Sequence, residues 1–259
     1  MSLKINKLRL RVCELASKGG EGHVPSALSV LDIVWVIYDK FINLKKILSS
    51  KIDREHFIMS KGHGCLAQYV VLEKKKLIKK GQLDTYLGFN SNFGGHPDQN
   101  KIKGVEASTG SLGHGFPIAA GIAYAKKLLN HNSKVFCIVG DGECNEGTIW
   151  ETCLLASHHK LDNLVCIVDK NLSTDRAVKI DNIKKKFQSF NWKTVVVNGH
   201  NHLALKRILK TKSKRPIAII ANTIKGKNVD FMEKSQHEWH HKNISLETLK
   251  KIKNDLKLS

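Results

Sequence analysis

The sequence predicts an α/β fold in which one parallel β-sheet is covered by helices on both faces. Short, continuous runs of apolar, β-prone residues alternate with helical stretches along the chain, a pattern typical of strands buried in a parallel sheet. Two of these runs, 135–139 and 163–168, lead into glycine or polar residues, and ligands of such sheets bind beyond the strand ends. Neither a repeat nor a linker-like segment interrupts the pattern, so we expect one domain.

The elements can be predicted in order along the chain. The pattern over 3–18 predicts an amphipathic helix, and Pro25, a residue favoured in the first helical turn, begins a second helix over 25–41. A Gly-rich, polar region occupies 88–115. The other predicted strands are 56–60, 193–197 and 216–221, and the other predicted helices are 64–76, 116–129, 147–160, 202–210 and about 245–257.

Length and composition suit a folded protein with an apolar core. The chain has 259 residues, of which 41% are hydrophobic, enough for one large domain or two small ones. No apolar run is long enough to cross a membrane, and the N-terminus lacks the apolar segment and cleavage site of a signal peptide. We therefore expect a cytoplasmic protein without membrane association. The six cysteines form no C-x-x-C pair, which predicts buried free thiols.

The net charge of +20 leaves two interpretations open. A strongly basic chain can bind nucleic acid. The lysines are spread through many short stretches, however, and neither an aromatic-rich RNA-binding motif nor a zinc finger accompanies them. A lysine-rich surface is the favoured interpretation, and a basic rim would also attract phosphorylated substrates.

Polar residues follow two of the predicted strands. Asp141 lies between two glycines after the first strand, and Asn171 follows the second. The intervening helix of about 13 residues rises roughly 20 Å, enough to return the chain to the start of a parallel strand. Both side chains are therefore expected at the same edge of the sheet. A carboxylate and an amide oxygen suit Mg²⁺ or Ca²⁺ better than zinc, and the glycines let a bulky ligand approach the backbone.

Each half of this pair has a simpler interpretation, since Gly-Asp-Gly is a common turn and Asn a common helix cap. Their combination at the spacing of one β-α-β unit instead favours a metal site that holds a diphosphate. Mg²⁺ takes few protein ligands and completes its shell with phosphate oxygens and water.

The stretch GDGECNEG, followed by VDKN, resembles the thiamine diphosphate motif. Over almost its whole length the chain resembles the N-terminal, diphosphate-binding part of transketolase. The other matching stretches, in the family's order, are GGEGHVPSALSVLDIVWVIY, FIMSKGHG, FGGHPD, ASTGSLGHGFPIAAGIAYA and IKGKNVDFMEKSQHEWHHK. Any one stretch would be weak evidence, but their succession is highly specific.

The resemblance implies the ligands of the metal and of the diphosphate. Asp141, the Asn171 side chain and the Ser173 carbonyl would bind the divalent cation, Mg²⁺ or Ca²⁺. Gly142 would contact the diphosphate of thiamine diphosphate through its backbone, and His63 would contact the same side of the cofactor.

The resemblance also assigns roles to histidines. His23 and His96 would hold the donor sugar's hydroxyl groups and help its proton transfers, and His240 would contact the cofactor near the reacting centre. His240 is preferred over His241 because it directly follows Trp239. Five of the 13 histidines follow a glycine, a context that suits a site with many polar contacts; they are His23, His63, His96, His114 and His200. His202 is expected to be a surface or core residue.

Gly110 and Leu112 would line the aminopyrimidine pocket. Glu146 would lie at a subunit interface near the carboxylate network that activates the cofactor. The chain departs from the family in a shorter and more polar stretch over 171–187, and in TGSLG, where Gly-Pro-Leu-Gly is commoner. The polar stretch allows a specialised sugar pathway.

In this family the cofactor lies between two domains, and the second, pyrimidine-binding domain supplies a glutamate to the aminopyrimidine ring. Residues 1–259 leave no room for that domain. The resemblance therefore implies the N-terminal subunit of a split transketolase, inactive alone and completed by a C-terminal subunit in an α2β2 assembly. It would transfer a two-carbon ketol unit from a ketose, expected to be phosphorylated, to an aldose.

Three alternatives stay open. A split 2-oxo-acid decarboxylase or dehydrogenase would keep the Gly-Asp-Gly and Asn motif, but it need not keep His23, His96 and His240. A basic binding protein without enzymatic activity would explain the charge alone. A homologue without catalytic activity would have a regulatory role.

Overall fold

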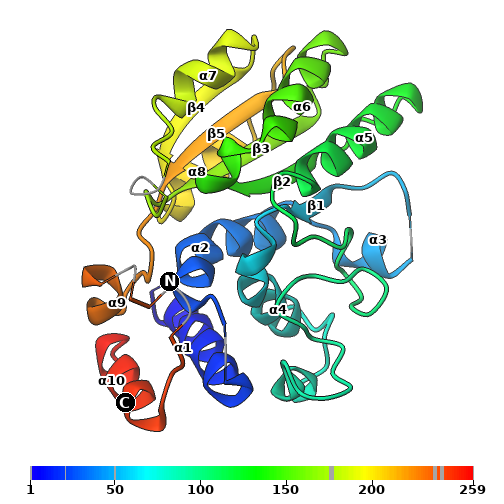
Figure 1. Cartoon of the computed structure of the whole chain (residues 1–259). Coiled ribbons are helices and arrows are strands. Elements are labelled where there is room, and N and C mark those ends of the chain that lie inside the picture. Colours follow the sequence, from blue (N-terminus) through cyan, green and yellow to red (C-terminus); the bar gives the residue numbers. More distant parts are fainter. Residues whose placement is uncertain are drawn as a thin grey trace.

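The computed structural model describes residues 2–20, 22–49, 51–174, 178–235, 238–239 and 242–258. Its centre is a five-stranded, wholly parallel sheet with the strand order β1-β2-β3-β5-β4 (Figure 1). Each strand coincides with a predicted one to within two residues, so the predicted α/β class is confirmed. The strands are β1 (His56–Met59), β2 (Val135–Gly140), β3 (Leu164–Lys170), β4 (Lys193–Asn198) and β5 (Ile217–Asn222).

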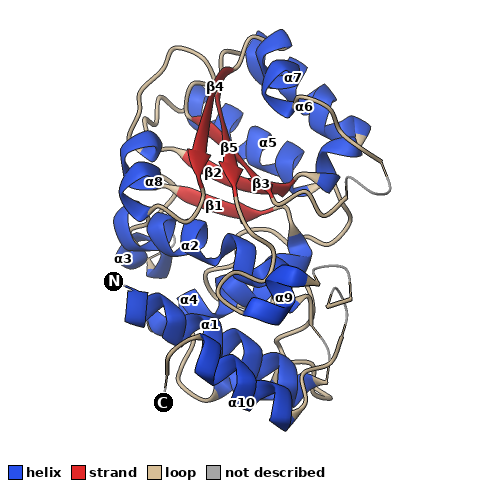
Figure 2. Cartoon of the chain, turned by 90° about the vertical axis from the view of Figure 1, so that its left-hand side faces the viewer, coloured by secondary structure: helices blue, strands red, loops and turns tan. Residues whose placement is uncertain are grey.

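Helices cover both faces of the sheet (Figure 2). One face packs against α1 (Ser2–Gly19), α2 (Val24–Lys40), α4 (Cys65–Lys74) and α8 (His202–Leu209), with α9 (Asp230–Lys234) and α10 (Leu246–Asp255) beyond them. The other face packs against α5 (Gly115–Leu128), α6 (Gly147–His158) and α7 (Ile183–Ser189). Side chains alternate between the faces, as the pleat requires: Phe136 and Ile138 of β2 point to the α2 side, and Cys137 and Val139 to the α5 side.

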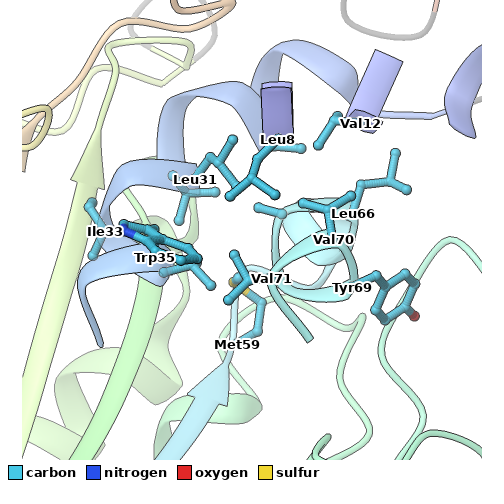
Figure 3. Packing of buried hydrophobic residues seen from close by; sticks show 14 of the residues in the cluster. Leu8, Val12, Leu31, Ile33, Trp35, Met59, Leu66, Tyr69, Val70 and Val71 are labelled. Carbon is cyan, nitrogen blue, oxygen red and sulfur yellow. The ribbon is translucent and has the colours of Figure 1, made fainter. Parts of the chain in front are cut away.

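The larger core lies between α1, α2, α4 and the sheet (Figure 3). Leu31 of α2, Leu8 of α1 and Val70 of α4 meet there above Met59 of β1. The helix α2 is buried from Val24 to Tyr38. Most of its side chains are apolar, and the buried Ser29 and Asp32 are hydrogen-bonded within the protein. This burial holds the N-terminus of α2 rigidly against the carboxyl ends of the strands.

Three short helices were not predicted. They are α3 (Leu44–Leu48), α7 and α9. In α7 only Ile183 and Phe187, one turn apart, are buried, and a lysine-rich sequence surrounds them. The helix begins because the Asn182 side chain accepts the Lys185 N–H at 3.0 Å. Such a short pattern is too weak to detect against neighbouring polar residues.

The predicted free thiols are confirmed, since all six cysteines are buried and unpaired. Among the helices in the described parts of the chain, none combines the length and the apolar character that crossing a bilayer requires.

Candidate functional site

The candidate site lies where β1, β2, β3 and β5 end. β2 and β3 are hydrogen-bonded neighbours with Gly140 opposite Asp169, so Asp141 and Asn171 leave the sheet at the same edge, as predicted. The Asn171 N–H donates to Asp141 Oδ2 at 2.9 Å. The strand ends therefore bring together the two residues that the Gly-Asp-Gly and Asn spacing singled out.

Asp141 is a buried carboxylate held by backbone donors. Its Oδ1 accepts the Gly142 N–H at 2.9 Å, and its Oδ2 also accepts the Leu172 N–H at 2.6 Å. Burial, and then the nearby Asp169 carboxylate, raise the pKa of Asp141 above its ordinary value. A cation beside this group would offset the cost of its negative charge, which is what a metal ligand position needs.

Asn171 can add an uncharged oxygen ligand to the same cation. Its Nδ2 donates to Asp169 Oδ2 at 3.2 Å, which leaves the amide oxygen on the other side, where it accepts the Ser173 N–H at 3.1 Å. The second lone pair of this oxygen can coordinate a cation. Among the described residues no group of three or more His, Cys, Asp or Glu side chains could hold a metal. The donors present are those of a hard cation that shares its shell with phosphate and water.

Thr174 offers a further observation that fits a polar ligand. A Cβ added at Gly142 would lie 2.3 Å from Thr174 Cγ2, so the loop after β3 occupies the space that any other side chain at 142 would need. Thr174 Oγ1 is buried and has no hydrogen-bond partner among the residues that the structure describes. Buried hydroxyl groups are rarely left unsatisfied, and a phosphate oxygen or a metal-bound water would supply the partner.

Next to Asn171 lies a buried ion pair that the sequence analysis did not identify. Asp169 is 0% exposed, and Lys61 Nζ lies 2.5 Å from its Oδ2. Ser29 Oγ donates to the same oxygen at 2.7 Å, and Thr223 Oγ1 donates to Oδ1. Burial alone would raise the pKa of Asp169, but the Lys61 ammonium and the donors lower it below its ordinary value. The feature of the sequence that could have indicated this ion pair is Asp169, a charged residue directly after the apolar run 164–168.

Glu143 connects the loops around the site. It accepts hydrogen bonds from Ser60 Oγ, from the Gly113 N–H at 2.9 Å and from the Gly140 N–H at 3.0 Å. Burial raises the pKa of this carboxyl group. Glu146, which the resemblance placed at an interface, is exposed, and a Cβ added at Gly113 would lie 2.9 Å from its Cβ.

The predicted histidines gather around the loop after β1. The rings of His23 and His63 have centroids 5.1 Å apart. A Cβ added at Gly62 would lie 3.0 Å from His96 Cδ2 and 2.9 Å from Gly110 N. His23, His63, His96 and Gly110 therefore belong to one region.

Other predicted residues are placed differently. Leu112 is 38% exposed, and His114 is exposed with its Nδ1 3.0 Å from the Leu112 carbonyl oxygen. His240 and His241 lie outside the described residues. His200 is hydrogen-bonded within the protein, to Asp32 and to the Ile224 N–H, and His202 also contacts Asp32.

Lys225 is a second buried cation near the acidic side chains, also missed from the sequence. It is 1% exposed. Burial and then the Lys61 ammonium lower its pKa to about 8, while the carboxylates of Asp141 and Asp169 act in the opposite direction. A lysine at this place can bind a diphosphate as a point charge.

The volume of a pocket does not by itself identify the site in this protein. A hollow of about 180 Å³ adjoins Asp141 and Leu172. A larger hollow of about 750 Å³ is lined by residues such as Lys127, Lys134 and Asn163, at the edge where β2 and β3 begin. Ligands of parallel sheets bind at the carboxyl ends of the strands, and the buried charges lie there.

Titration of Lys225 predicts a pH dependence of anion binding. Because its pKa lies near 8 and not at 10.5, the positive charge is lost as the pH rises through about 8. We expect the affinity of the chain for magnesium pyrophosphate to fall over that range, and the unliganded fold to gain stability from about 8 toward 10.5. Calorimetric titrations on both sides of this pKa measure the effect.

Lys225→Met should flatten this pH dependence. Lys227→Met is the matched control, because Lys227 is half-buried and its Nζ lies 3.3 Å from Glu233. If the affinity for magnesium pyrophosphate falls equally with pH in the unsubstituted chain and in Lys225→Met, Lys225 is not the group that titrates.

Comparisons of sequence and structure identify known proteins that are similar to this chain. The family model described as transketolase, thiamine diphosphate binding domain, matches residues 1–259. An apulose-4-phosphate transketolase subunit of Phocaeicola vulgatus is 33% identical over 249 residues, which cover 93% of this chain and 88% of that protein. Transketolase of Pongo abelii is 32% identical over 243 residues, covering 92% of this chain and 39% of that protein. The crystal structure of a transketolase from Campylobacter jejuni matches with a TM-score of 0.89 and 28% identity, covering 100% of this chain and 43% of that one.

Proposed function

This chain belongs to the transketolase family, and on that basis we propose that it is the diphosphate-binding subunit of a split, thiamine diphosphate-dependent transketolase. The observation that carries the proposal is the pairing of Asp141 and Asn171 at the ends of β2 and β3 in a chain that covers 88% of a protein named as one subunit of a transketolase. The chain spans less than half of the longer transketolases it matches. We propose that a second chain completes the activity, since one relative of similar length is named as a subunit.

We propose that Asp141, the Asn171 side-chain oxygen and the Ser173 carbonyl hold Mg²⁺. Gly142 and Lys225 would bind the diphosphate, the first through its backbone and the second through its charge. Thiamine diphosphate, when bound, supplies the nucleophilic carbon and the electron sink for ketol transfer. The protein's own contribution at this end is to fix the position of the metal and the diphosphate.

The histidine region would bind the sugar. His23, His63 and His96 can each donate and accept hydrogen bonds, and they converge on the loop after β1. We propose that they orient the hydroxyl groups of a phosphorylated ketose and move protons at its oxygen atoms. Gly110 and Leu112 would face the aminopyrimidine ring, and His240 would complete the set.

A partner subunit would supply the catalytic group that acts on the aminopyrimidine ring. We propose a C-terminal subunit that carries the pyrimidine-binding domain, in an α2β2 assembly with Glu146 at an interface. The support is the exposure of Glu146 and the names of two relatives, which call each of them a subunit of apulose-4-phosphate transketolase. The six free buried thiols favour a cytoplasmic location.

Reconstitution with a candidate C-terminal subunit tests the proposal. The two chains would be co-expressed and purified with Mg²⁺ and thiamine diphosphate, and ketol transfer from a ketose phosphate to an aldose phosphate would be followed. We expect transfer only when both chains are present, and its loss on addition of a chelator. A stable complex that binds neither the metal nor thiamine diphosphate would overturn the proposal, whereas binding without transfer from common sugars would require other donors.

A further inference from the structure

His200 links a buried carboxylate to the segment that carries Lys225. Its Nδ1 lies 2.8 Å from Asp32 Oδ2, and its Nε2 accepts the Ile224 N–H at 2.9 Å. Because Nε2 accepts, the ring proton is on Nδ1 and donates to Asp32. The imidazole is thus a neutral bridge with both nitrogen atoms in use, and Asp32 is itself held by Arg9.

Four residues of the segment 222–226 are hydrogen-bonded to three other parts of the protein: the loop 199–200, Lys170 and Pro25. The Asn222 carbonyl accepts the Gly199 N–H at 2.8 Å, and the Thr223 N–H donates to the Lys170 carbonyl at 3.0 Å. The Gly226 N–H donates to the Pro25 carbonyl at 3.0 Å. The Ile224 N–H has His200 as its partner. This bond fixes Ile224. The residue before it, Thr223, donates to Asp169, and the residue after it is Lys225.

We propose that His200 is a positioning residue for the diphosphate site: it fixes the backbone at Ile224, between Thr223, which donates to Asp169, and the buried Lys225, and thereby holds the Lys225 side chain in place. This inference rests on the proposed function of the site. A Cβ added at Gly199 would lie 2.4 Å from Thr223 Cγ2, so the loop that carries His200 is already packed tightly against the same segment.

His202 provides a matched comparison within the same cluster. Its Nε2 lies 2.6 Å from the other oxygen of Asp32, and its side chain is 10% exposed, against 13% for His200. Both histidines therefore contact one carboxylate at similar burial. The difference relevant here is that His200 accepts the N–H of Ile224.

The test compares His200→Ala, His202→Ala and His200→Gln in the full chain. The affinity for magnesium pyrophosphate would be measured by calorimetry, amide exchange at Ile224 by nuclear magnetic resonance, and stability by thermal unfolding. We expect His200→Ala to weaken binding about tenfold, the size of one lost charge-assisted contact, and to speed exchange at Ile224. Glutamine can place an acceptor near the Nε2 position, so His200→Gln should recover most of the affinity.

His202→Ala should lower the unfolding temperature about as much as His200→Ala does, yet leave affinity and Ile224 exchange near those of the unsubstituted chain. Equal losses of affinity in both alanine variants, or unchanged exchange at Ile224 in His200→Ala, would overturn the inference. If the unsubstituted chain does not bind magnesium pyrophosphate, the proposed function fails instead, and Ile224 exchange still decides whether His200 fixes the segment.

Discussion

Asp141→Asn is expected to weaken Mg²⁺-dependent binding of thiamine diphosphate on the order of 100-fold while leaving the fold almost as stable as before. The substitution removes the negative charge that a hard cation needs. It also removes a buried charge whose pKa is raised by burial and by Asp169, so its cost to folding disappears. The amide oxygen can still accept the Asn171 and Leu172 N–H groups that now bind Oδ2. The amide nitrogen cannot accept the Gly142 N–H that now binds Oδ1, and this loss offsets part of the gain from removing the buried charge.

Calorimetry of the full chain, with and without a candidate C-terminal subunit, would measure binding, and urea unfolding would measure stability. We expect the free energy of unfolding to change by less than about 1 kcal/mol. Asp181→Asn is the matched control, because Asp181 lines the hollow next to Asp141 but is exposed. Unchanged cofactor binding in Asp141→Asn would contradict the metal assignment, and so would an equal loss in Asp181→Asn.

Asp169→Ala is expected to lower the free energy of unfolding by about 3–5 kcal/mol, because it leaves the Lys61 ammonium buried without its carboxylate. Lys61 is 2% exposed, so water cannot replace the lost partner. The substitution also removes the acceptor of Ser29 and Thr223. Chemical unfolding monitored by fluorescence measures the loss.

Two further variants separate the cost of leaving a buried charge unpaired from a general loss of stability. Glu247→Ala breaks an exposed ion pair in which the Lys251 Nζ lies 2.9 Å from the carboxylate, and it should leave stability almost unchanged because water screens the pair. The double variant Lys61→Met with Asp169→Leu replaces both charges by apolar groups and should recover most of the stability lost in Asp169→Ala. A loss in Asp169→Ala no larger than that in Glu247→Ala would show that the pair contributes little.

The sequence was sufficient for the five strands and for the expectation that Asp141 and Asn171 lie at one edge of the sheet. Runs such as 135–139 and 163–168 indicate buried strands by local composition, and the length of the helix between them requires the two strands to run in the same direction. Asp141 and Asn171 were predictable for that reason: each directly follows its strand, so strand direction alone places them at one edge. The short helix α7, with only Ile183 and Phe187 buried, carried too little pattern to be found.

The tertiary structure decided which distant side chains meet. β5 lies between β3 and β4 in the sheet, an order that local pattern does not determine. That order brings Thr223 to Asp169 and places the buried Lys225, two residues further along the chain, after the same end of the sheet. The bonds from Lys61 to Asp169 and from His200 to Asp32 join residues more than 100 positions apart. Local sequence sets the period and direction of each element, but only the packing of elements against one another selects these contacts.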